Sequence, residues 1–158
     1  MKSIHFPTRY IPKTLTRKDK QKQLNMLMKS RKLYKKHKYF TRKKVSSFKT
    51  KKSNHLTDAY RIYNITKIKP DKELARKTGC TVQALKQIVK KGEGAYYSSG
   101  SRPNQTPTSW GLARLASSIT SGKAAAVDFK IIDKGCDHKK KAYILANKSR
   151  KIKLGIHK

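Results

Sequence analysis

The residues that most often carry out catalysis are few in this chain and are poorly spaced for it. The sequence of 158 residues contains eight Asp and Glu, five His and two Cys. The acidic residues are too scattered to predict a carboxylate pair for general acid–base catalysis. The spacing of the histidines and serines predicts no nucleophile–base–acid triad. We therefore expect no catalytic residues and a protein that is not an enzyme.

Metal and cofactor sites are equally poorly supported. Cys136 and His138 form a C-x-H sequence, but a zinc site needs further ligands at defined spacing, and His157 is distant. The fragment Gly92–Gly94 lacks the third glycine and the preceding strand of a dinucleotide-binding turn, and the chain has no Walker sequence. We expect no metal, no cofactor and no small-molecule substrate.

The strongest feature of the chain is its positive charge. Forty-one Lys and Arg stand against eight Asp and Glu, a formal net charge of +33. Residues 1–52 contain 19 basic and one acidic residue, residues 134–158 contain nine and one, and residues 94–133 contain only four and two. A compact protein with this charge repels itself unless a polyanion neutralises it. Nucleic acid is the first candidate, and an anionic membrane surface or an acidic protein lattice is the second.

Two sets of side chains are predicted to meet partners. Basic residues of the N-terminal region, of a helix near residue 85 and of a central loop are predicted to contact phosphate or another polyanion. These residues are Arg17, Lys18, Lys35, Lys36, Arg42, Lys43, Lys44, Lys86, Lys90 and Arg102. Aromatic residues interleaved with the cations either stack on bases or anchor the arms in apolar pockets of partner proteins, and both alternatives remain open. The anchor candidates are Phe6, Tyr10, Phe40 and Phe48.

The cysteines and the apolar segments indicate the kind of cellular compartment and whether the chain spans a membrane. Two cysteines, Cys80 and Cys136, do not suggest a disulfide framework, so a reducing compartment is the default expectation. The N-terminus lacks the apolar run of a signal peptide, and no stretch approaches the roughly 20 apolar residues of a membrane span. We expect a soluble or peripheral protein.

Cap residues and apolar spacing predict helices in the first half of the chain. Two prolines in residues 1–15 favour an extended segment. Thr16 begins a capping-box-like sequence, and a mostly exposed basic helix is expected over 17–37. Residues 38–52 show no clear period. Ser53 caps a short helix whose apolar residues follow helical spacing and are expected in the core.

The sequence from Asp71 to Gly92 has the layout of a helix-turn-helix. Gly79 is expected to end the first helix and Thr81 to cap the second, which Gly92 would end. The second helix would expose Gln83, Lys86, Gln87 and Lys90. Such side chains can meet base edges or phosphates. Many helix-loop-helix units have this spacing without touching DNA, so both alternatives stay open.

A loop, a core helix and two strands are predicted in the second half. Residues 92–109 are predicted to form a long Gly/Ser-rich loop, which packs its own tyrosines or holds a phosphate. Thr106 followed by Pro107 begins the core helix of the domain, expected over 107–121. Its face of Trp110, Leu112, Leu115 and Ile119 is expected to be buried. Alternating apolar residues predict short strands at 126–132 and at 152–156.

Three stretches of the chain together resemble a known domain. They are FPTRYIPKTLTRKDKQKQ, SRKLYKKHKYFTRKKVSSFKTKKSNH and KGEGAYYSSGSRPNQTPTSWGLARLASSITSGKAAAVDF. They resemble a basic domain of unknown biochemical activity found in large double-stranded DNA viruses of algae and protists. In looser relatives from some tailed phages the patterns G-A-Y, S-G-x-R-P and W-x-x-A-R recur. These patterns stand here at Gly94–Tyr96, Ser99–Pro103 and Trp110–Arg114. The similarity covers most of residues 6–136; it implies a viral origin and transfers no catalytic residue.

Charge, pattern and resemblance lead to one interpretation. We expect a mainly α protein with a small helical domain at 53–133, a basic N-terminal arm at 1–52 and a basic C-terminal tail at 134–158. We expect a non-enzymatic structural component of a large DNA virus particle. It would be a minor capsid or internal virion protein that bridges other capsid or virion proteins, an anionic inner membrane or the genome. The expected location is the virion, and the host cytoplasm or nucleus during assembly. The alternative is a genome-binding or condensing protein that uses the helix-turn-helix-like element.

Overall fold

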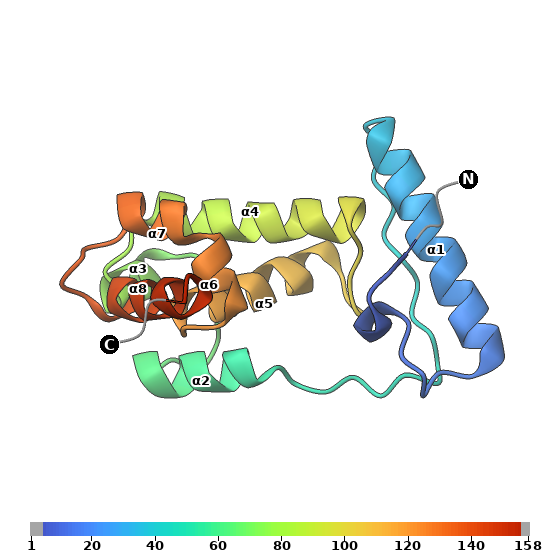
Figure 1. The fold of residues 1–158 in the computed structure, drawn as a ribbon, viewed down its shortest axis with the longest axis horizontal. Coiled ribbons are helices and arrows are strands. Elements are labelled where there is room, and N and C mark those ends of the chain that lie inside the picture. The colour runs from blue at the N-terminus through green and yellow to red at the C-terminus, as the bar shows by residue number, and fades with distance from the viewer. Residues whose placement is uncertain (1–4, 156–158) are drawn as a thin grey trace. The chain divides into compact units, whose positions relative to one another are not determined.

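The computed structural model describes residues 5–155 and is mainly α-helical, as predicted. A short 3-10 helix, η1, covers Thr8–Tyr10, and Figure 1 shows the α-helices in chain order from blue to red. They are α1 (Arg17–Lys35), α2 (Asn54–Tyr63), α3 (Lys72–Thr78), α4 (Val82–Ser98), α5 (Pro107–Ile119), α6 (Lys123–Val127), α7 (Phe129–Gly135) and α8 (Lys141–Lys153). Within residues 5–155, extended pairing is limited to an isolated antiparallel bridge between Cys80 and Cys136.

The predicted cap residues begin their helices as expected. The side chains of Thr16, Thr81 and Thr106 each accept a hydrogen bond from the backbone N–H three residues further on, at 3.2, 3.1 and 3.0 Å. Asp71, which was expected only to begin the sequence of α3, caps that helix in the same way at 3.0 Å. Ser53 caps α2 in the same way, through the N–H of His55 at 3.2 Å. These bonds satisfy backbone donors that the first helical turn leaves without a partner. The starts of α1, α2, α3 and α5 are therefore encoded locally.

The chain divides into two compact units, and this division differs from the expected one. Unit 1 consists of Met1–Lys51 and Glu93–Trp110, and unit 2 consists of Lys52–Gly92 and Gly111–Lys158. The N-terminal segment, expected to be an arm, packs with a segment from the middle of the sequence. Helices α4 and α5 each begin in one unit and end in the other. The charge is also shared, since unit 1 has 19 basic and two acidic residues and unit 2 has 22 and six.

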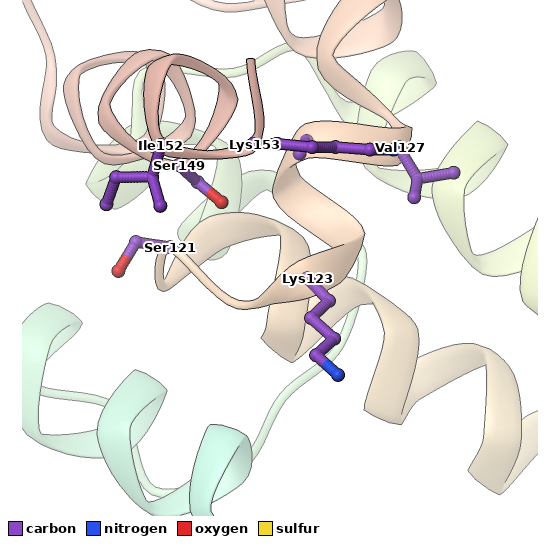
Figure 2. A pocket seen from close by; sticks show the side chains of 7 residues that line it. Ser121, Lys123, Val127, Ser149, Ile152 and Lys153 are labelled. Carbon is purple, nitrogen blue, oxygen red and sulfur yellow. The ribbon is translucent and has the colours of Figure 1, made fainter. Parts of the chain in front are cut away.

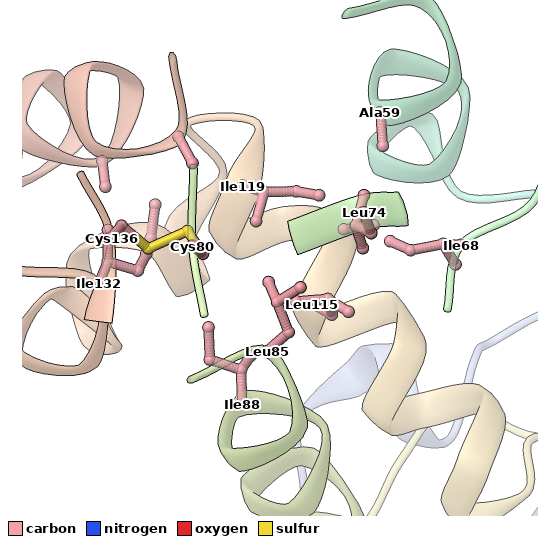
Figure 3. Packing of buried hydrophobic residues seen from close by; sticks show 14 of the residues in the cluster. Ala59, Ile68, Leu74, Cys80, Leu85, Ile88, Leu115, Ile119, Ile132 and Cys136 are labelled. Atoms are coloured by element: carbon pink, nitrogen blue, oxygen red, sulfur yellow. A yellow bond between two sulfur atoms is a disulfide. The ribbon is translucent and has the colours of Figure 1, made fainter. Parts of the chain in front are cut away.

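Unit 2 is built around one apolar core. Leu85, Leu115, Ile119 and Ile132 are each completely buried in it. Figure 3 shows these side chains converging with others from α2, α3 and α4. The predicted core face of α5 is confirmed at Leu115 and Ile119, whereas Leu112 is half-buried. Helix α5 thus contributes fully buried side chains to the core of unit 2, as its apolar spacing predicted.

A disulfide bond joins Cys80 and Cys136, which the two cysteines in the sequence did not suggest. The bond links the turn between α3 and α4 to the end of α7 (Figure 3). Two backbone hydrogen bonds of 2.8 Å flank it, from Thr81 N–H to the Gly135 carbonyl and from Asp137 N–H to the Gly79 carbonyl. The fold brings the two cysteines together by pairing the backbones of two distant segments. Two isolated cysteines in a sequence do not reveal such a pairing.

Helix α4 is longer than predicted and replaces part of the expected loop. It continues through Gly92 and Gly94 to Ser98. A Cβ at Gly92 would lie 2.6 Å from the Cα of Gly111 in α5, so glycine permits these two helices to approach closely. Gly92 therefore allows α4 to pack closely against α5, and it does not end the helix. The prediction of a helix stop rested on the more common role of glycine as a cap.

The two predicted strands are helical instead. Residues 126–132 lie in α6 and α7, and Ile152 lies in α8. Helix α8 buries Ala142 and Ala146, which are four residues apart, while Ile152 is 60 % exposed. The buried face of α8 is formed by small alanines, which contribute little to a hydrophobic pattern. The alternating large residues therefore dominated the pattern and predicted strands. Ile156, at the end of the second expected strand, lies outside the described residues.

Unit 1 has two small apolar clusters that contain the predicted partner anchors. Phe6 and Tyr10 are buried with Leu27 of α1, at 7 % and 6 % exposure. Phe40 and Phe48 are half-buried against the other cluster, formed by Leu15, Met26 and Val45. The role expected for Phe6 and Tyr10 as anchors in a partner is corrected, because this chain buries them itself. Phe40 and Phe48 are only half-buried, so their role as anchors stays a prediction. Burial of aromatic surface stabilises the fold of unit 1.

Candidate nucleic-acid interface

Helix α1 presents a stripe of five lysines and one asparagine to solvent. The stripe follows helical spacing, and all of its members are exposed. They are Lys18, Lys22, Asn25, Lys29, Lys32 and Lys36, the last being the C-cap residue. We call this set the α1 stripe. A helix of 19 residues is about 28 Å long, which corresponds to roughly eight base pairs of duplex DNA.

The single carboxylate of α1 is turned away from the stripe. Asp19 is buried, and its Oδ2 accepts hydrogen bonds from both the backbone N–H, at 2.9 Å, and the hydroxyl of Ser47. The hydrogen bonds from Ser47 lower the pKa of Asp19 below its ordinary value. Ser47 also accepts from the N–H of Thr16 at 3.1 Å. The negative charge is thus used to fasten the start of α1 to the segment 38–52.

The segment 38–52 lies along α1 and adds further cations. The Nζ of Lys22 donates to the Lys44 carbonyl at 3.2 Å, and the N–H of Lys43 points to the Sδ of Met26 at 3.3 Å. The side chains of Lys43 and Lys44 are exposed, as are the predicted contact residues Arg17 and Lys35. Unit 1 therefore gathers most of the predicted N-terminal contact residues around α1.

Arg42 is the exception among those predicted contacts, because its guanidinium is buried. It donates to the hydroxyls of Ser30 and Ser101 at 2.9 and 2.8 Å and to the Tyr96 carbonyl at 2.8 Å. Its Cζ lies 3.7 Å from the centre of the Tyr96 ring. Burial lowers the pKa of Arg42 and raises that of Tyr96. Arg42 is thus a structural link between distant parts of unit 1 and does not face a phosphate.

A separate group of polar residues lies on α4 in unit 2. Its exposed face carries Gln83, Lys86, Gln87 and Lys90, as expected, and the opposite face is buried. The turn before it is held by Gly79, whose φ of 80° is left-handed, and by the disulfide. Arg102, the remaining predicted contact, is exposed in unit 1.

Few of the cations are neutralised within the chain. Among residues 5–155, four Lys or Arg side chains lie within 4.0 Å of a carboxylate: Arg61, Lys77, Lys91 and Arg114. Two of them share the fully buried Asp128, which Arg114 contacts at 2.8 and 2.9 Å. The hydrogen bonds to Asp128 raise the pKa of Arg114. Most of the positive charge is therefore free to attract an external anion.

An apolar groove is present in unit 2. It has a volume of about 490 Å³, and Figure 2 shows side chains from α8 and from residues around α6 that line it. The lining residues are Ser121, Lys123, Ala126, Val127, Ser149, Ile152 and Lys153. The groove contains no Asp, Glu, His or Cys. Across residues 5–155, no cluster of side chains could hold a metal ion, and no helix is long and apolar enough to cross a membrane.

Three tyrosines in unit 1 form a cluster that the sequence did not predict. The ring of Tyr39 lies 5.0 Å from that of Tyr97, which lies 6.1 Å from Tyr34 and nearly parallel to it. Tyr39 is 70 % exposed. Tyr39 stands among lysines in the sequence and Tyr34 is only five residues before it, but Tyr97 of α4 lies 58 residues further along the chain.

Fold and charge together define a mainly helical, strongly basic protein with exposed cationic helices. Comparison with known families then identifies it further: the family of unknown function DUF5824 matches residues 7–141, and the chain belongs to this family. The match includes both units and reaches the first residue of α8. No curated protein and no solved structure matches the chain.

Proposed function

We propose that this protein binds nucleic acid through its folded basic surfaces and has no catalytic role. The observation that carries the proposal is the excess of exposed cations, five of which lie on one face of α1. Phosphate backbones supply closely spaced negative charge and release counterions when lysine and arginine replace them. A stripe on one helix face can follow such a backbone without reading its sequence.

The face of α4 offers a second surface of a different kind. Gln83 and Gln87 stand among Lys86 and Lys90, and glutamine can form two hydrogen bonds with adenine in the major groove. We propose that this helix-turn-helix-like element contributes contacts to duplex DNA, in addition to the phosphate contacts of α1. Condensation or packaging of a viral genome fits such a protein, and the viral setting rests on the sequence resemblance alone.

The salt dependence of binding tests the main proposal. Anisotropy titrations of a fluorescent duplex at several salt concentrations should give a linear fall of log K against log salt, with a slope of about −0.9 per phosphate contact. Replacing Lys18, Lys32 and Lys36 by Gln should reduce the magnitude of that slope by up to about 2.7. These three lysines are exposed, and within residues 5–155 their side chains make no hydrogen bond, ion pair or ring contact.

A matched variant distinguishes the effect of the α1 stripe on binding from the effect of the protein's net charge. Replacing Lys67, Lys69 and Lys148 of unit 2 by Gln removes the same charge from exposed positions elsewhere. This control should change the slope less than the α1 variant does. Equal effects would mean that total charge, and not the α1 stripe, sets the affinity. Binding that does not respond to salt would refute the proposal.

A minor capsid protein is the second candidate, favoured by the groove in unit 2. Val127 and Ile152, which line the groove, are 56 and 60 % exposed, and Lys123 and Lys153 line it with them. An acidic segment with apolar side chains, from a shell protein, is complementary to such a surface. This candidate predicts association with shell proteins at fixed stoichiometry that persists in high salt, whereas nucleic-acid binding predicts a steep loss.

A further inference from the structure

The tyrosine cluster of unit 1 has one ring open to solvent and two rings behind it. Tyr39 is the most exposed of the large hydrophobic side chains, at 70 %, whereas Tyr34 and Tyr97 are half-buried. The planes of Tyr34 and Tyr97 are 8° apart, and Tyr39 is inclined to them by 56° and 53°. We call these three residues the tyrosine platform. An exposed aromatic ring supported by others is suited to stacking on a flat ligand.

The backbone at the end of α1 sets the position of Tyr39. His37 has a left-handed φ of 60°, and its N–H donates to the Tyr34 carbonyl at 3.0 Å. The N–H of Lys38 donates to the Leu33 carbonyl at 2.9 Å. These two bonds form a Schellman motif, which ends a helix with a sharp turn. The chain therefore reverses just before Tyr39 and places its ring against Tyr97 of α4.

A buried tyrosine, Tyr96, lies behind the platform. Tyr97 packs edge-on against Tyr96, with ring centres 5.3 Å apart and planes 86° apart. The Tyr96 ring is completely buried and covers the guanidinium of Arg42. A stacking surface that is ordered before binding loses little conformational entropy when a ligand arrives.

Cations adjoin the platform and indicate the charge of its ligand. Lys35, Lys36 and Lys38 are exposed within four residues of Tyr39 along the chain. Unit 1 contains two acidic residues, of which Asp19 is buried and Glu93 is half-buried, one helical turn before Tyr97. A flat ring beside several lysines matches a nucleotide, whose base stacks and whose phosphate is anionic.

We propose that Tyr39, supported by Tyr97 and Tyr34, stacks on an unpaired base of single-stranded nucleic acid. This inference rests on the proposed nucleic-acid binding and names the form of ligand that this part of unit 1 takes. Bases in a duplex already stack on each other, so their faces are covered, whereas single strands expose them. Phe40 and Phe48 do not compete for this role, because both pack against the cluster of Leu15, Met26 and Val45.

Binding of single-stranded and duplex oligonucleotides by Tyr39 variants tests the inference. The probes are a fluorescein-labelled oligothymidylate and a labelled duplex of the same length, titrated with the full chain. Tyr39→Ala should weaken binding of the oligothymidylate by about fivefold to a hundredfold, the range that loss of one aromatic stacking contact produces. Binding of the duplex should change by less than about twofold. Tyr39→Phe, which keeps the ring, should bind both probes as the natural chain does.

A second variant and a folding control make the result decisive. Tyr39→Leu keeps apolar cover over Tyr97 but has no ring, so it should lose affinity as Tyr39→Ala does. Fluorescence of Trp110 in unit 1 verifies that each variant remains folded. Full oligothymidylate binding by the Ala or Leu variant would overturn the inference, as would an equal loss on the duplex. In either case a salt-dependent affinity would leave the proposed function standing, whereas no binding of either probe by the natural chain would refute both.

Discussion

Replacing Arg42 by Ala should destabilise unit 1 strongly, although Arg42 belongs to a region that the sequence predicts to be an arm. The guanidinium makes three hydrogen bonds, to Ser30, Ser101 and Tyr96, and lies over the Tyr96 ring. Each bond contributes about 1 kcal/mol and the ring contact about 1 to 2 kcal/mol. Relief from burying a charge offsets part of this sum. We expect the free energy of unfolding to fall by about 2 to 4 kcal/mol.

Two further substitutions separate geometry from charge. Arg42→Lys keeps the positive charge, but one ammonium group cannot reproduce the planar fork that reaches three acceptors, so it should lose most of the same stability. Lys43→Ala is the matched control, since Lys43 is the exposed neighbour of Arg42. Its effect should stay within about 0.5 kcal/mol, as is usual for exposed positions.

Trp110 makes the measurement specific to unit 1. It is the only tryptophan of the chain, and its ring packs edge-on against Tyr10, with centres 6.0 Å apart. Urea unfolding followed by its fluorescence should show a midpoint lower by about 1 to 4 M for Arg42→Ala, given a slope of about 1 to 2 kcal/mol per M for a small unit. A loss below about 0.5 kcal/mol would refute the argument that Arg42 links residues 5–51 to residues 93–110.

Three further outcomes are expected. Reducing the bond between Cys80 and Cys136 should lower the free energy of unfolding by about 4 kcal/mol in urea titrations, since it opens a loop of 56 residues; the double Cys→Ser variant should not respond to reductant. Asp128→Asn should lower the free energy of unfolding by about 3 kcal/mol in the same assay, because it removes the buried partner of Arg114. The pKa of Asp19 is lower in the folded state than its ordinary value of 3.8. The ionised carboxylate therefore stabilises the fold above pH 3.8, and this stabilisation is lost as the pH falls through the folded-state pKa. Asp19→Asn should therefore flatten the acid side of the stability–pH curve, and an unchanged curve would contradict this assignment.

Features that depend on neighbouring residues were predicted correctly from the sequence. The cap residues Thr16, Ser53, Thr81 and Thr106 each accept the expected backbone hydrogen bond. The core face of α5 could also be predicted, because large apolar residues repeat at helical spacing. These features need no information about what lies across the fold.

Features that depend on distant residues could not be predicted. Helix α1 buries Asp19, Gln23 and Ser30 as well as Met26 and Leu27, so its buried face is partly polar and hydrophobic spacing missed it. Because the buried face of α1 was not recognised, residues 1–52 were predicted to be an arm outside the folded domain.

The same limit applies to the candidate site. The lysines of α1 were predicted as contacts because charge is visible in a sequence. The tyrosine platform was not predicted, because Tyr39 meets Tyr97 only through a fold in which α4 continues past Gly92. Arg42 was assigned to the surface for the same reason, since its acceptors Tyr96 and Ser101 lie 54 and 59 residues away in sequence.

The interleaving of the two units along the chain has a consequence for synthesis on the ribosome. The first part of unit 1 ends at Lys51, and its packing partner ends at Trp110, 59 residues later. At roughly 5 to 20 residues per second, about 3 to 12 s separate the emergence of these two segments. During that interval the nascent N-terminal segment carries 18 basic residues and one acidic residue beside ribosomal RNA, while the tyrosine that covers Arg42 has not yet been made. Nascent unit 1 must therefore complete its fold after synthesis has passed through much of unit 2, in direct competition with the polyanion nearest to it.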